Sequence, residues 1–135
     1  MRPRVVLAED HPAVAEELRT LLTTDYDVVQ VVHNGQTLLE YARWTMPDVI
    51  VSDIGMPGMS GLQVLRTLRA ERFAIRVVLI TIRSEPELIT HALALGASGF
   101  VLKSDAGEEL LAAVEACLRG EEYLSSGARA LLDSL

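Results

Sequence analysis

The sequence has 135 residues, a length typical of a single domain of about 100–150 residues. Half of the residues are apolar, which excludes an intrinsically disordered chain. The net charge of −7 argues against nucleic acid or an anionic membrane as a direct partner of this chain. The single cysteine excludes a disulfide framework, a cysteine-rich zinc site and an iron–sulfur cluster, and it favours a reducing compartment.

No targeting or membrane-spanning segment is visible in the sequence. The apolar stretch Val5–Ala8 is shorter than a signal-peptide core of about 7–15 residues. No uncharged apolar run approaches the roughly 18 residues of a membrane span. We therefore expect a soluble protein of the cytoplasm.

Five short apolar runs predict the strands of a parallel sheet. They are rich in β-branched residues and mostly continuous, which is typical of strands that helices cover on both faces. The segments between them carry apolar residues at helical spacing. This alternation predicts an α/β fold, a doubly wound sandwich with a five-stranded parallel sheet and right-handed crossovers. The predicted strands are Val5–Ala8, Val28–Val32, Val49–Ser52, Val77–Ile80 and Phe100–Leu102.

Local signals predict where several helices begin and end. The segments 84–87 and 105–108 have the spacing of capping boxes, with Ser84 and Asp105 as the capping residues. Gly96 is placed where a helix needs a residue in the left-handed conformation to stop.

The C-terminal segment differs from the rest. Residues 120–124 predict a turn-like break, after which Ser125 or Ser126 caps a short helix over 128–132. We therefore divide the chain into a domain, 1–120, and a tail or the start of a linker helix, 121–135.

Polar side chains follow four of the five predicted strands. Glu9 and Asp10 follow the first strand, Asp53 the third and Thr81 the fourth, and the fifth ends at Lys103. In an open α/β sheet, side chains at the carboxyl ends of the strands converge on one crevice. We therefore expect three carboxylates, a hydroxyl and an ammonium to form one site.

This set of groups favours phosphoryl transfer to a protein carboxylate. Three neighbouring carboxylates repel one another unless a cation lies among them, and Mg²⁺ accepts such hard oxygen ligands. A carboxylate can attack a phosphoryl group, while a metal and a lysine neutralise the oxygens that are transferred. Each residue alone also has an ordinary explanation: Asp10 as a helix cap, Asp53 as a loop acid, Thr81 as a strand-end residue and Lys103 as a solvated charge.

Together these residues resemble a response-regulator receiver domain, the flavodoxin-like module of two-component signalling. The motifs that carry the resemblance are Glu9-Asp10, the segment 53–61 (DIGMPGMSG), Thr81 and the segment 100–103 (FVLK), in matching order and spacing. The resemblance covers about residues 4–118 and is nearest to the receivers of NarL/LuxR-type transcriptional regulators. It implies a (βα)5 fold with strand order 2-1-3-4-5.

The resemblance also implies a role for each residue of the site. Asp53 would be the phosphoacceptor, and the pocket would bind Mg²⁺ through Asp10, Asp53 and the Gly55 carbonyl, with Glu9 acting through water. Thr81 and Lys103 would contact the phosphoryl group. Phe100 would be the switch aromatic that turns inward when Thr81 moves, although a plain core aromatic explains Phe100 equally well.

The implied partners are a sensor histidine kinase and, on activation, a second copy of the chain. Residues 120–132 resemble the end of receivers that precede a LuxR-type helix-turn-helix domain. Transcription would then be controlled through a DNA-binding domain outside this chain. The chain would not be an enzyme apart from Mg²⁺-dependent self-phosphorylation and self-dephosphorylation of Asp53.

Some residues depart from the usual pattern of the family and favour other functions, and others lie outside the predicted site. Ile82 replaces the small residue that usually follows the switch threonine and could narrow the pocket, which leaves open a phosphorylation-independent docking or dimerisation module. A phosphatase with an aspartate nucleophile would need a second acid at Gly55. The three histidines lack metal-ligand spacing. We expect Cys117 to be a buried small apolar residue and Trp44 a half-buried anchor.

Overall fold

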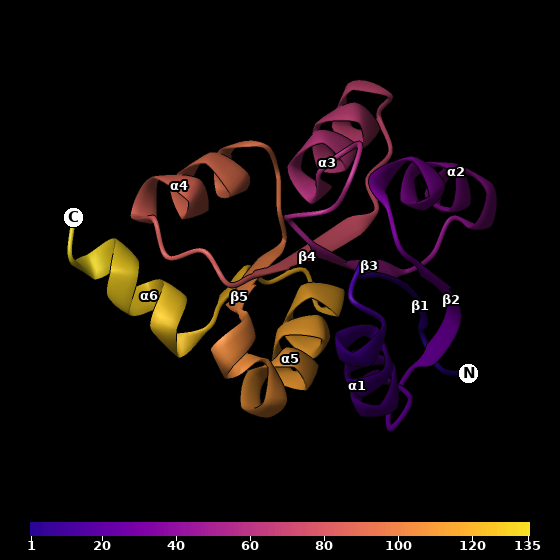
Figure 1. The fold of residues 1–135 in the computed structure, drawn as a ribbon, viewed down its shortest axis with the longest axis horizontal. Helices are drawn as coiled ribbons and strands as arrows, with labels where there is room; N and C mark the ends of the chain where they lie inside the picture. The colour runs from indigo at the N-terminus through magenta and orange to yellow at the C-terminus, as the bar shows by residue number, and fades with distance from the viewer.

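A parallel sheet of six strands runs through the molecule, with helices on both faces (Figure 1). The computed structural model describes residues 1–135. The strands are β1 (Arg4–Ala8), β2 (Asp27–Val32), β3 (Val49–Asp53), β4 (Arg76–Thr81), β5 (Gly99–Leu102) and β6 (Tyr123–Leu124). The helices are α1 (Pro12–Leu22), α2 (Gly35–Thr45), α3 (Gly61–Ala70), α4 (Pro86–Ala94), α5 (Lys103–Leu118) and α6 (Ser126–Asp133). The order β2-β1-β3-β4-β5-β6 confirms the flavodoxin-like α/β prediction and adds a strand at one edge.

The sheet divides the hydrophobic core into two layers. Side chains alternate across each strand, so Val6 and Ile50 pack against α2, α3 and α4, whereas Val5 and Val51 pack against α1 and α5. Figure 1 shows the same division of helices above and below the sheet. Because both faces are covered, the central strands are apolar at nearly every position, and this is why they read as continuous apolar runs.

The sixth strand corrects the expected turn-like break at residues 123–124 only, because the chain does turn at Gly120, whose φ is +83°. β6 pairs in parallel with the edge of β5, and the Tyr123 N–H donates to the Ser98 carbonyl at 3.0 Å. An edge strand presents unpaired N–H and C=O groups, and a segment that follows α5 closely is well placed to cover them. Only two residues pair, which is too short a run for sequence periodicity to reveal.

The helix-end predictions have mixed outcomes. Gly96 has φ of +99° directly after α4, which confirms the left-handed stop. Ser125 caps α6, and its hydroxyl accepts from the Ala128 N–H. The two predicted capping boxes are wrong. α4 begins at Pro86 after Glu85 without a side-chain cap. α5 begins two residues before Asp105, whose carboxylate instead accepts from the Gly127 N–H at 2.9 Å.

The sequence also predicts the burial of two single residues, Cys117 and Trp44. Cys117 is buried as expected, and burial raises the pKa of its thiol to about 11. The assignment of Trp44 is wrong, because 81% of this residue is exposed. No helix combines the length and the hydropathy that crossing a bilayer would require.

Candidate functional site

The carboxyl ends of β1, β3, β4 and β5 bring the predicted polar residues to one edge of the sheet. Glu9 follows β1, Asp53 ends β3 and Thr81 ends β4, while Lys103 follows β5 directly and opens α5. Residues 94 positions apart in the sequence thereby become neighbours, because parallel strands end at the same edge.

Lys103 joins two of the acidic residues by ion pairs. Its Nζ lies 2.9 Å from Asp53 Oδ2, with hydrogen-bond geometry, and 2.7 Å from Glu9 Oε1. The second contact has an ion-pair distance but not the angles of a hydrogen bond. Burial alone would lower the pKa of Lys103, but the contacts with Glu9 and Asp53 outweigh it, so this pKa lies above its ordinary value. The ammonium is therefore firmly charged and offsets part of the negative charge of the pocket.

Glu9 is fully buried and is held from two sides. Its Oε2 accepts from the backbone N–H of His11 at 3.0 Å, and its backbone carbonyl lies 2.9 Å from His33 Nδ1. A buried carboxylate without such partners would be costly. The two histidines therefore support the site from its periphery, a role that no pattern in the sequence indicates.

Asp10 supplies an acidic oxygen that the protein leaves unsatisfied. Its Oδ1 is buried and makes no hydrogen bond, although His11 Nδ1 lies 3.3 Å away. Ligand atoms of Glu9, Asp10 and His11 lie within 4.8 Å of one another, whereas Asp53 is outside this group. Unsatisfied buried polar atoms are rare, and a hard cation is the partner that a carboxylate oxygen accepts most readily here. The carboxylate oxygens fit a divalent metal such as Mg²⁺, whereas the nitrogen of His11, which also belongs to this group, is not a ligand that Mg²⁺ prefers.

Asp53 is positioned by the turn that follows β3. Its Oδ1 accepts from the Gly55 N–H at 3.1 Å, which leaves the exposed Gly55 beside the carboxylate. The turn closes tightly, since a Cβ atom on Gly61 would lie only 2.5 Å from the Asp53 carbonyl oxygen. Glycine at the start of α3 therefore lets the backbone approach the acidic residue closely.

Thr81, at the end of β4, and Phe100, in β5, are the two remaining predicted residues of the site. Both are buried, and the Thr81 hydroxyl accepts from the Arg83 N–H at 3.0 Å. Phe100 is fully enclosed, so its ring has the inward position in this structure. Ile82 is 82% exposed, so its side chain packs against little of the protein.

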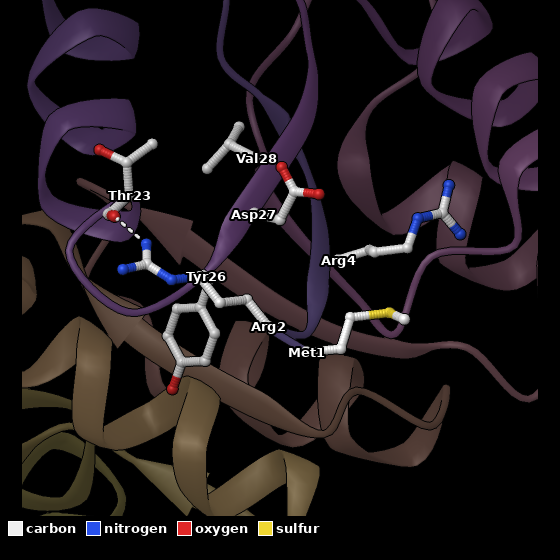
Figure 2. Close-up of a pocket in the computed structure, with 7 residues that line it drawn as sticks. All are labelled: Met1, Arg2, Arg4, Thr23, Tyr26, Asp27 and Val28. Atoms are coloured by element: carbon white, nitrogen blue, oxygen red, sulfur yellow. Dashed lines mark hydrogen bonds between the residues drawn. The ribbon is translucent and has the colours of Figure 1, made fainter.

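A separate hollow of about 470 Å³ lies at the opposite end of the sheet, where β1 and β2 begin (Figure 2). The Arg2 guanidinium donates to the Thr23 carbonyl at 2.8 Å at its side. The hollow has one carboxylate, Asp27, among its lining residues and lies at the amino ends of the strands. It is therefore distinct from the acidic site, which lies at the carboxyl ends.

Comparison with known proteins identifies the class to which this fold and site belong. The family model of the response regulator receiver domain matches residues 5–115. The chain therefore belongs to the response-regulator receiver family.

Its relatives narrow the assignment to receivers of NarL/LuxR-type regulators. The chain is 37% identical over 124 residues to the probable transcriptional regulatory protein NarL of Mycobacterium tuberculosis, covering 90% of this chain and 57% of that protein. It is 35% identical to the transcriptional regulatory protein MctR of Rhizobium johnstonii over 92% of this chain and 59% of the relative. The chain thus spans less than two thirds of these curated relatives.

Solved structures agree with this placement. A LuxR-family response regulator from Aurantimonas superposes with a TM-score of 0.94 at 31% identity, covering 99% of this chain and 97% of the other. The receiver domain of the M. tuberculosis NarL gives a TM-score of 0.85 at 36% identity over 89% and 98% of the two chains. The first similarity extends through nearly the whole chain and so includes the region of β6 and α6.

The close approach at Gly61 generates a stability prediction. A methyl group in Gly61→Ala has to displace the Asp53 carbonyl oxygen, 2.5 Å away, and also crowds the Ser52 hydroxyl at 3.0 Å. We expect the free energy of unfolding in urea to fall by about 1–3 kcal/mol. Gly107→Ala is the matched control, because a Cβ there meets no atom within 4 Å and alanine favours the interior of α5 by about 0.5–1 kcal/mol. Equal stabilities of the two variants would contradict the role given to Gly61.

Proposed function

We propose that this chain is a phosphorylation-controlled switch that accepts a phosphoryl group on Asp53 from a sensor histidine kinase. The observation that supports it most is the position of Lys103, within 3 Å of both Asp53 and Glu9 although the three residues follow different strands. An ammonium fixed beside a carboxylate at this distance can neutralise the oxygens of an incoming phosphoryl group.

The chemical step makes one bond and breaks one. A carboxylate oxygen of Asp53 attacks the phosphorus of a phosphohistidine on the kinase, the phosphorus–nitrogen bond breaks, and an acyl phosphate remains on Asp53. Lys103 moves its ion pairing from the carboxylates toward the new phosphoryl oxygens. In a separate hydrolysis step, water attacks the phosphorus, the bond between phosphorus and the Asp53 oxygen breaks, and inorganic phosphate leaves; this self-dephosphorylation ends the signal.

The acidic residues are proposed to hold Mg²⁺. Asp10, Asp53 and the Gly55 carbonyl would be direct ligands, and Glu9 would act through water. The unsatisfied Asp10 Oδ1 and the exposed Gly55 backbone support this assignment. When bound, the ion supplies charge neutralisation at the carboxylates, since two or more acids around one phosphoryl group would otherwise repel it.

Thr81 and Phe100 are proposed to read the new charge. The Thr81 hydroxyl would turn from the Arg83 N–H toward a phosphoryl oxygen, breaking a 3.0 Å hydrogen bond that holds the start of the loop after β4. Phe100, the proposed switch aromatic, would be held in the inward position once Thr81 has moved; its ring is already enclosed in this structure. Because the loop leads into α4, its rearrangement alters the face formed by α4, β5 and α5.

The output is proposed to be control of transcription in the cytoplasm. The relatives named above are transcriptional regulators and are longer than this chain. The net charge of −7 makes this chain a poor ligand for DNA, so contact with DNA is assigned to an output domain outside it. Phosphorylation would favour a homodimer that presents two such domains.

Labelling with acetyl phosphate tests the phosphoacceptor. With Mg²⁺ present, we expect one acid-stable, hydroxylamine-labile phosphate per chain, measured by intact mass and mapped to the peptide that contains Asp53. Asp53→Ala should remove the label, whereas Asp48→Ala, an acid at the other end of β3, should leave it in place. Unchanged labelling of Asp53→Ala would show that Asp53 is not the phosphoacceptor.

Sedimentation velocity tests the switch itself. Beryllofluoride mimics the acyl phosphate, so with Mg²⁺ we expect it to convert the monomer to a dimer in wild type but not in Asp53→Ala. A sedimentation coefficient that is independent of beryllofluoride in wild type would instead favour a constitutive docking or dimerisation module.

A further inference from the structure

The C-terminal segment, Tyr123–Asp133, is attached to β5 by backbone pairing and by one buried side chain. Ser125 is fully buried, and its hydroxyl accepts from the Leu102 N–H at 3.1 Å and from the Ala128 N–H at 3.4 Å. The Ser125 N–H donates to the Phe100 carbonyl at 3.0 Å. Ser125 thus bonds to the backbone of Phe100 and to that of Leu102, the residue directly before Lys103.

Leu102 is the residue that places Lys103. It ends β5 and forms the cap of α5, and its own side chain supplies no capping hydrogen bond. Lys103 is the next residue and reaches Asp53 and Glu9 from the first turn of α5. Because Lys103 directly follows Leu102, the Leu102 backbone sets the point from which the Lys103 side chain reaches its two carboxylates.

The first turns of α5 hold the same segment from a second side. Asp105 accepts from the Gly127 N–H at 2.9 Å, and Glu109 accepts from the Tyr123 hydroxyl at 2.8 Å and from the Ser126 N–H at 3.0 Å. Leu124 and Leu131 pack against the core beside α4. The start of α5 and residues 123–133 therefore form one connected unit, on the side of the sheet seen at the left of Figure 1.

We propose that Ser125 is a positioning residue of the phosphorylation site, fixing the end of β5 and with it the place of Lys103 Nζ. This inference rests on the proposed function, in which Lys103 contacts the phosphoryl group. It extends the switch beyond residues 5–115, which the family model matches, into a segment that the sequence suggested was only a tail or linker.

The coupling between Ser125 and phosphoryl binding at Lys103 acts in both directions. If Ser125 favours the placement of Lys103 that binds a phosphoryl group, then phosphoryl binding must in turn stabilise residues 123–133 on β5 and α5. The segment closest to a following output domain then changes its protection with the state of Asp53.

Lys103 is the sole lysine of the chain and serves as its own probe. Protein labelled at lysine Cε and Nζ gives one side-chain resonance, which reports the surroundings of Lys103 without any ligand. We expect Ser125→Ala to move this resonance, because the Leu102 N–H loses its acceptor. Ser125→Thr keeps the hydroxyl but adds a methyl group at this fully buried position, so it should return the resonance only part of the way to the wild-type position. Ser126→Ala is the matched control, since the Ser126 side chain is exposed and only its backbone is bonded.

The same variants are then titrated with beryllofluoride and Mg²⁺ by calorimetry. We expect Ser125→Ala to bind at least about 5-fold more weakly than wild type, and Ser126→Ala to bind like wild type. In wild type, amide exchange of residues 123–133 should slow on binding, which tests the coupling even if Ser125→Ala does not fold.

The outcomes separate this inference from the function on which it rests. Failure of wild type to bind beryllofluoride would overturn the proposed function, while the lysine resonance of the unliganded variants would still decide the role of Ser125. Binding by wild type together with unchanged resonance and affinity in Ser125→Ala, or unchanged exchange of residues 123–133, would overturn the inference.

Discussion

A single partly buried ammonium group organises the acidic edge of this receiver domain. Lys103 contacts a carboxylate that follows β1 and another that ends β3, and it does so from the first residue of α5. Two carboxylates in a largely buried setting would repel each other without such a cation. The pocket therefore requires that β1, β3 and β5 end at the same level, and the parallel sheet satisfies this requirement.

The remaining features of the site serve to fix those three strand ends. Glu9 is held through the backbone of His11 and the ring of His33, and Asp53 is enclosed by a turn that only glycine at position 61 permits without displacement. Ser125 completes the set from outside the matched family region by bonding to the end of β5. Each support acts on the backbone beside a charged residue, so the geometry of the charges depends on ordinary hydrogen bonds and close packing.

The sequence predicted the central fold because the five main strands are buried on both faces and therefore apolar throughout. It also predicted that Glu9, Asp53, Thr81 and Lys103 lie at one edge, since strand order and strand polarity decide that placement. It did not predict β6, because two paired residues leave no periodic signal. It misjudged Asp105 as a helix cap, because its true partner, the Gly127 N–H, is 22 residues away. Long-range backbone contacts of this kind have no local pattern, and this is also why the role of Ser125 was visible only in the structure.

The central claim is that Lys103, paired with Asp53 and Glu9, forms the phosphoryl-binding pocket. The most direct measurement is the resonance of this sole lysine in wild-type protein, followed as beryllofluoride is added in the presence of Mg²⁺. The account predicts that the signal moves to a new position as the ammonium turns from the carboxylates to the bound fluoride atoms, and that Asp53→Ala shows no such change. A lysine resonance that stays in place while wild type binds beryllofluoride would contradict it.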